Sequence, residues 1–322
     1  MKNEMVNELI GVMRERIPKG SNLANSLMEI LCMGKEAIYR RLRGEVAFTF
    51  EEVSLISQHL GISLDKIVGR RMLNDTMFDL NLLHTGDPIE SYYEILVRYA
   101  KLFDLLRDDP TASVATASNL IPFTFYSPYE CLSKFRLGRW IYHHGKMKPP
   151  ASLSDLQVPD KVPQMHWKLS ASIRQLSHTS FIWDYNIFRS IVKEIRYFAG
   201  LDLLSAEDVR NMKKELGLLL SELEAVTMTG EFSKGHSLAI YLSDINFEAT
   251  YTYVEKGDFQ ACLFRVYSIN SMDSQNPRMC NIQKNWIQSL KRHSTLISQS
   301  SEIQRRQFFN EQREIVESLQ EA

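Results

Sequence analysis

The apolar residues of the first seventy positions recur at spacings of three and four, and this recurrence is broken at short intervals. The first run holds Met5, Leu9, Val12, Met13 and Ile17. Such spacing places apolar side chains on one face of a helix. Pro18 and Gly20 end the run. The pattern predicts a series of short amphipathic helices that can be buried only against one another.

Two further helices follow within the next twenty-five residues. Ser21 or Asn22 is suited to cap the second helix, because a short polar side chain can accept from the first free amides. The third helix is expected over about residues 35–43. It ends at Gly44, since glycine tolerates the left-handed conformation that often follows a helix.

The segment "TFEE" predicts the start of a fourth helix. Thr49 and Glu52 have the spacing of a capping box, in which each side chain accepts from the backbone amide of the other residue. Gly61 is expected to close this helix, and "SLDKIVG" at residues 63–69 predicts a short fifth one.

The third helix has two chemically different faces. At 100° per residue, Ile38 and Leu42 lie one turn apart and point inward. The outward arc holds Lys35, Glu36, Tyr39, Arg40 and Arg43. A charge-rich arc of this kind is commonly a solvated surface. It is also able to pair with base edges and phosphates in a DNA groove.

The order of these elements resembles the DNA-binding domain of the phage lambda repressor and Cro family, over about residues 5–69. The matching positions are Met33, Ile38, Leu42, Gly44, Phe48, Thr49, Leu55, Ile56, Leu60, Ile62, Ser63, Leu64 and Ile67. The resemblance implies a five-helix, helix-turn-helix domain whose third helix enters the major groove. Two positions depart from the family pattern: Met28 replaces a small residue, and Cys32 replaces the glycine of the turn.

The resemblance also implies roles for individual residues. The residues expected to contact bases are Lys35, Glu36, Tyr39 and Arg40. Those expected to contact phosphates are Arg43, Thr49, Ser21 and Asn22.

Charge and cysteine content limit the other possibilities. Thirty-eight Lys and Arg residues face thirty-nine Asp and Glu residues, so any contact with nucleic acid must come from a local patch. We find no secretion signal and no apolar run long enough to cross a membrane. The four cysteines are scattered, which argues against a disulfide framework and structural zinc. These features predict a cytoplasmic protein.

Beyond residue 72 the pattern is mostly helical. Helices are expected at about residues 88–107, 128–144, 165–182, 186–199, 205–226, 279–297 and 301–319. Between them, about residues 237–269 alternate with a period of two, which predicts a small three-stranded antiparallel meander. We therefore expect a mainly α protein with a DNA-binding domain at residues 1–72. A larger helical region should follow at 73–322, with a subdivision at the Pro-rich loop 146–164.

The sequence contains few candidates for a catalytic or metal-binding site. Motifs for nucleotide binding, for metal-dependent hydrolysis and for a serine nucleophile are absent. We expect no catalytic residues, no metal site, no cofactor and no enzyme activity. One aromatic cluster suggests either an apolar ligand pocket or simple core packing. Its members are Phe123, Phe125, Tyr126, Tyr129, Phe135, Trp140 and Tyr142.

These observations favour a sequence-specific transcriptional regulator that binds double-stranded DNA as a homodimer. Residues 73–322 would dimerise or sense a signal, with a small molecule or a peptide as a possible effector. Phe309, Gln312, Val316 and Leu319 form a short seam that suits either a partner helix or its own domain. Two alternatives remain: a peptide- or protein-responsive, antitoxin-like switch, and an enzyme with an attached DNA-binding domain.

Overall fold

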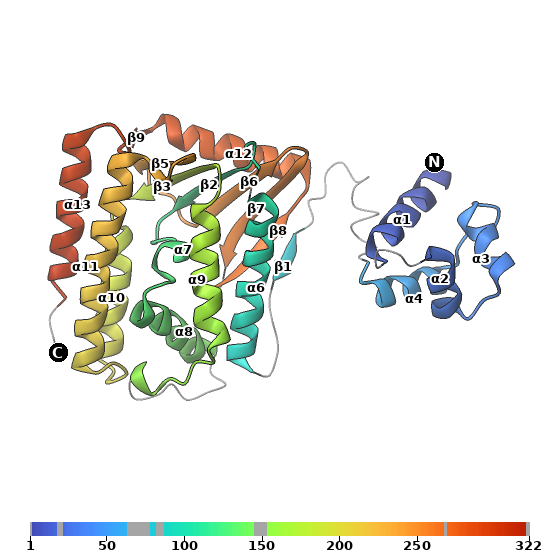
Figure 1. The fold of residues 1–322 in the computed structure, drawn as a ribbon, viewed down its shortest axis with the longest axis horizontal. Helices are drawn as coiled ribbons and strands as arrows, with labels where there is room; N and C mark the ends of the chain where they lie inside the picture. Colours follow the sequence, from blue (N-terminus) through green and yellow to red (C-terminus); the bar gives the residue numbers. More distant parts are fainter. Residues whose placement is uncertain are drawn as a thin grey trace. The chain divides into compact units, whose positions relative to one another are not determined.

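The computed structural model describes residues 2–17, 22–62, 78–81, 87–107, 109–144, 153–266 and 269–319. The chain divides into two compact units, Met1–Met77 and Phe78–Ala322 (Figure 1). Among the described residues, no helix has both the length and the apolar character that a membrane crossing requires.

Short helices make up the described part of the first unit. They are α1 (Lys2–Arg16), α2 (Leu23–Leu31), α3 (Lys35–Leu42) and α4 (Phe50–Leu60). The fifth helix expected at residues 63–69 lies outside the described residues. Helices this short are marginal in isolation, so their stability must come from packing.

Each of these four helices contributes one completely buried side chain to a shared core. These side chains are Met13, Leu27, Ile38 and Ile56. The periodicity of three and four therefore identified the inward faces correctly. Leu55, which the resemblance counts among the matching apolar positions, is 42% exposed and lies outside this core.

The second unit is a layered α/β structure. Its helices are α6 (Pro88–Leu106), α7 (Phe123–Tyr126), α8 (Glu130–His144), η1 (Leu153–Asp155), α9 (Lys161–Arg174), α10 (Ile187–Ala199), α11 (Ala206–Thr229), α12 (Pro277–Arg292) and α13 (Glu302–Glu317). Its strands are β1 (Asp79–Asn81), β2 (Ser113–Ser118), β3 (His178–Asp184), β4 (Glu231–Ser233), β5 (His236–Ser243), β6 (Tyr251–Lys256), β7 (Phe259–Val266), β8 (Asn270–Ser274) and β9 (Ser294–Leu296).

All of these strands belong to one mixed sheet. Its order is β1-β8-β7-β6-β2-β3-β5-β4, with β9 paired to β5. Strands β2, β3 and β5 are parallel neighbours, and the chain between them passes through helices, as parallel pairing requires. Strands β6, β7, β8 and β1 continue the sheet in antiparallel pairs.

This sheet corrects the expected fold class. A mainly α protein with a small antiparallel sheet at about residues 237–269 is wrong, because the nine-stranded sheet begins at β1 and ends at β9. The expected meander is also wrong in part. Strands β6 and β7 pair as expected, but β2 and β3 lie between β6 and β5. Residues 165–182, expected as one helix, contain the end of α9 and most of β3.

Helices cover both faces of the sheet (Figure 1). In β3, Phe181 and Trp183 belong to the large core that includes helices α6 and α8–α11. Ile182, between them in sequence, belongs to a smaller core with residues of α12. Alternate side chains of a strand point to opposite faces, so β3 is buried on both.

Helix α13 packs against its own unit rather than offering a free seam. Phe309, Gln312, Val316 and Leu319 are each at most 2% exposed. The Gln312 Nε2 donates to the Tyr185 carbonyl at 2.9 Å. Of the two expectations for this helix, packing within its own unit is confirmed.

Candidate functional sites

Helix α3 is held from behind by apolar packing and by one ion pair. Ile38 is completely buried, and Leu42 packs against the same core. The Arg41 guanidinium donates from Nε to Glu52 Oε2 at 2.9 Å and from Nη2 to Glu52 Oε1 at 2.6 Å. Bidentate pairing of this kind fixes orientation as well as adding energy. It ties α3 to the first turn of α4.

The capping box expected at the start of α4 is confirmed. The Glu52 amide donates to Thr49 Oγ1 at 3.2 Å, and the Thr49 amide donates to Glu52 Oε2 at 2.9 Å. The Glu52 carboxylate therefore accepts hydrogen bonds from both the Thr49 amide and the Arg41 guanidinium. Hydrogen bonding from Arg41 lowers the pKa of Glu52 from its ordinary value of 4.5.

A glycine-dependent turn ends α3 and fixes the residues that follow it. Gly44 has a φ of +76°, and its amide donates to the Arg41 carbonyl. The Glu45 amide donates to the Arg40 carbonyl at 2.9 Å. These two bonds form a Schellman motif. The motif brings the Glu45 carboxylate within 2.6 Å of Arg43 Nε and 3.6 Å of Arg40 Nε.

The outward row of α3 lies where the sequence places it. Lys35, Glu36, Arg40 and Arg43 are exposed, and Tyr39 is half-buried against the core. The Lys35 ammonium lies 5.9 Å from the centre of the Tyr39 ring. Exposed ion pairs such as Arg43 with Glu36 and Glu45 are weak, so a phosphate is able to displace them.

The residues expected to contact phosphates have different surroundings. Thr49 is exposed, and its hydroxyl hydrogen remains available beyond the capping bond. Asn22 caps α2, with its side chain accepting from the Ala24 amide at 2.8 Å. Ser21 lies outside the described residues. At the start of α3, Gly34 provides no side-chain cap, which leaves the first amides to other acceptors.

The turn between α2 and α3 contains a residue in an unfavourable conformation. Cys32 has a φ of +51° and a ψ of +40°, and its amide donates to the Met28 carbonyl. Side chains with a Cβ lose roughly 1–2 kcal/mol in this region. The turn is therefore built as a left-handed cap without the glycine that normally suits it.

Cys32→Gly is expected to stabilise this turn by about 0.5 kcal/mol, because relief of the Cβ clash exceeds the added chain entropy of glycine. Hydrogen exchange of the α2 and α3 amides in the full-length chain measures the effect. Cys32→Ala is the matched control, since it keeps the Cβ and should bring no gain. Equal exchange rates in both variants would show that the turn stores no strain.

A cavity of about 270 Å³ lies in the second unit between the sheet and helices α6–α10. Its walls are largely aliphatic and aromatic, with side chains such as Ile95, Leu169 and Phe181. Leu120 and His143 also line it and are exposed, so the cavity reaches the surface beside them. The volume is close to the lower limit of about 300 Å³ for small-molecule sites.

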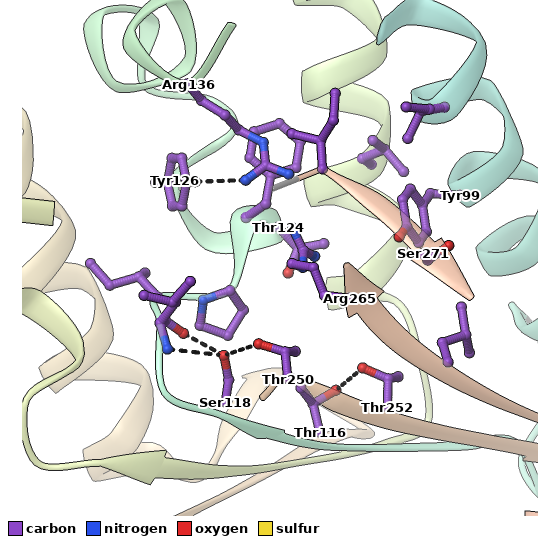
Figure 2. A pocket seen from close by; sticks show the side chains of 18 of the residues that line it. Tyr99, Thr116, Ser118, Thr124, Tyr126, Arg136, Thr250, Thr252, Arg265 and Ser271 are labelled. Carbon is purple, nitrogen blue, oxygen red and sulfur yellow. Dashed lines mark hydrogen bonds between the residues drawn. The ribbon is translucent and has the colours of Figure 1, made fainter. Parts of the chain in front are cut away.

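Arginines are the unusual feature of this cavity. Arg136 and Arg139 come from α8, and Arg265 comes from β7. Arg139 is paired with Glu194 of α10. Arg136 is only 7% exposed; its Nη1 donates to Tyr126 Oη at 3.1 Å (Figure 2).

Hydroxyl groups from β2, from β6 and from the residue just before β6 line one polar side of the cavity (Figure 2). Thr116 and Thr252 share a hydrogen bond of 3.1 Å, as do Ser118 and Thr250. Ser118 also donates to the Leu120 carbonyl. Each hydroxyl has one hydrogen to donate, so the Thr116–Thr252 pair retains one for another acceptor.

Part of the expected aromatic cluster lines this cavity. Phe123 and Tyr126 do so, whereas Phe125, Phe135 and Trp140 are buried in the surrounding core. The arginines had no signal in the sequence, because a lone arginine in a helix or a strand is typical of an exposed surface.

Comparison of the chain with known protein families, curated proteins and solved structures found no match.

Proposed function

We propose that the chain is a sequence-specific, DNA-binding transcriptional regulator acting in the cytoplasm. In this proposal α3 enters the major groove, as in the lambda repressor and Cro family that residues 5–69 resemble. The observation that carries it is the outward row of α3. Lys35, Glu36 and Arg40 project from a helix whose opposite face is fixed by Ile38 and by the Arg41–Glu52 pair.

The row has the chemistry needed to read bases. Arginine and lysine pair with the O6 and N7 acceptors of guanine, and a glutamate accepts from the cytosine amine. Arg40, Lys35 and Glu36 supply these groups from one helix face. Tyr39 adds a half-buried ring beside Lys35. Rigid support matters because base readout depends on geometry.

Phosphate contacts are assigned to Arg43, Thr49, Asn22 and Ser21. Such contacts fix the orientation of a protein on DNA without reading sequence. Arg43 is the C-cap residue of α3 and Thr49 is the N-cap residue of α4. In this proposal both side chains would contact the backbone next to the bases that α3 reads.

A module with one recognition helix covers few base pairs, so useful affinity requires two copies on a symmetric site. We therefore propose a homodimer. The second unit, residues 78–322, would supply the dimer contact or sense an effector.

Selection from a random pool of duplex DNA by the full-length chain tests this function. The expected result is a consensus made of two inverted half-sites. An asymmetric consensus would contradict the homodimer but keep sequence-specific binding. Recovery of sequences without any consensus would contradict the regulator itself.

A further inference from the structure

We propose that the cavity of the second unit binds a small organic carboxylate with an apolar body. This inference does not rest on DNA binding, because every residue that carries it belongs to the second unit and its test measures ligand binding directly.

The charge inside the cavity is the first observation. Three arginines and one glutamate line it, which gives a formal excess of two positive charges. Glu194 is taken by Arg139. Within the described chain, no carboxylate forms an ion pair with Arg136 or with Arg265. Arg136 is buried and Arg265 is partly buried. Charges withdrawn from water are normally paired, so two guanidinium groups without a carboxylate in one cavity require an explanation.

The local contacts of Arg136 do not neutralise it. Its guanidinium lies 4.3 Å from the centre of the Phe123 ring, and one nitrogen donates to the Tyr126 hydroxyl. Its Nε is buried and has no hydrogen-bond partner among the residues that the structure describes. A phenol and an aromatic ring hold the guanidinium in position, but neither provides a negative charge. The Arg136 Nη2 group has no hydrogen bond among the described residues and is not one of the buried atoms, so it remains as a donor for an acceptor in the cavity.

Arg265 approaches the same region from the sheet. Figure 2 shows it between Arg136 and the hydroxyls of Thr116 and Thr252. Burial, together with the charge of Arg136, lowers the pKa of Arg265. Although burial alone raises the pKa of Tyr126, the charges of Arg136 and Arg139 outweigh it and lower that pKa. The lowered pKa of Tyr126 therefore reflects the positive charges of the two α8 arginines beside it.

The remaining surfaces define the rest of the ligand. A carboxylate carries two oxygens, which guanidinium groups bind well, and the free hydrogen of the Thr116–Thr252 pair is a further donor. Beyond this polar corner the walls are apolar, including Ile95 and Leu169. Apolar pockets with a few convergent polar groups are typical of small-molecule sites. A carboxylate on an aliphatic or aromatic body fits both parts.

Isothermal titration calorimetry on the full-length chain tests the proposal with two pairs of probes. Octanoate and 2-naphthoate are the carboxylates, and octanamide and 2-naphthamide are their uncharged counterparts. We expect at least one carboxylate to bind about tenfold or more tightly than its amide. Arg265→Met should remove about tenfold or more of this affinity, while amide binding changes by no more than about twofold. Equal affinities for acid and amide, or no binding of either acid, would overturn the proposal.

Stability without added ligand provides a second test. Arg265→Met removes an unpaired charge, so the denaturation midpoint should rise or stay unchanged. Arg139→Met is the matched control, because it leaves Glu194 without its partner and should lower the midpoint. If Arg265→Met lowered the midpoint as far as Arg139→Met, Arg265 would be a structural residue and the proposed site would be wrong.

Discussion

Arg40→Ala is expected to reduce discrimination between the selected DNA site and its single-base variants by about 1–3 kcal/mol at one base position. The loss should be confined to that position, because one side chain pairs with one or two adjacent base edges. The Arg40 side chain is 54% exposed. Its Nε forms an ion pair with the Glu45 carboxylate at a distance of 3.6 Å. Its removal should therefore leave the fold intact. Fluorescence anisotropy with a panel of duplexes measures the effect.

Arg43→Ala provides the contrast in the same titrations. Removing a phosphate contact weakens all sequences alike and reduces the slope of log affinity against log salt by about one. Arg14, exposed on α1, is the control for loss of an arginine in the same unit. Small and equal effects from Arg40→Ala, Arg43→Ala and Arg14→Ala would favour a solvated face for α3.

Glu52→Ala is expected to destabilise the first unit by about 2–3 kcal/mol, because it removes the cap of α4 and leaves Arg41 without its partner. The side chains of Arg41 and Glu52 are only 14% and 8% exposed, so water compensates little. Hydrogen exchange of the α3 and α4 amides should accelerate by roughly 30- to 150-fold. Glu51→Ala, at an exposed neighbour in the same helical turn, should change exchange little.

The ion pair between Glu52 and Arg41 should make the stability of the first unit depend on pH in the acid range. Since its folded pKa is lowered, Glu52 contributes stability that is fully present well above 4.5, its ordinary value. This contribution is lost as the pH falls below 4.5 and through the lower pKa of the folded state. The α4 amides of the native protein should therefore be less protected against hydrogen exchange in acid. In Glu52→Ala this pH dependence should be reduced, and an unchanged dependence would assign it to other carboxylates.

Local signals explain why the helices of the first unit could be predicted from sequence. Capping at Thr49, the stop at Gly44 and the inward spacing of Ile38 all act within a few residues. The expected outward row of α3 followed from the same geometry. The ion pairs of Glu45 could not be predicted, because they depend on the particular turn that Gly44 allows.

The sheet was underestimated because its central strands depend on distant partners. Strand β3 is buried on both faces, and a short continuous apolar run such as "SFIW" is ambiguous between a buried strand and a buried helix. Strand β2 is only six residues long and has Pro122 four positions beyond its end, so its own sequence is a weak strand signal. Pairing of β2 with β3 joins segments more than sixty residues apart, so no local pattern reports it.

The cavity arginines show a further limit. Arg136 is on a helix and Arg265 on a strand, 129 positions apart in the printed sequence. Their approach is a consequence of strand order and of how α8 packs above the sheet. Only the three-dimensional structure brings their charges together.

Photocrosslinking from α3 tests most directly the claim that its outward row contacts base edges. Tyr39 is replaced by p-benzoylphenylalanine in the full-length chain, which is irradiated with the selected duplex. Tyr197, 57% exposed in the second unit, receives the same replacement as the control. The account predicts crosslinks to bases within a half-site from position 39 and none from position 197. Bound DNA without crosslinks from position 39 would contradict it.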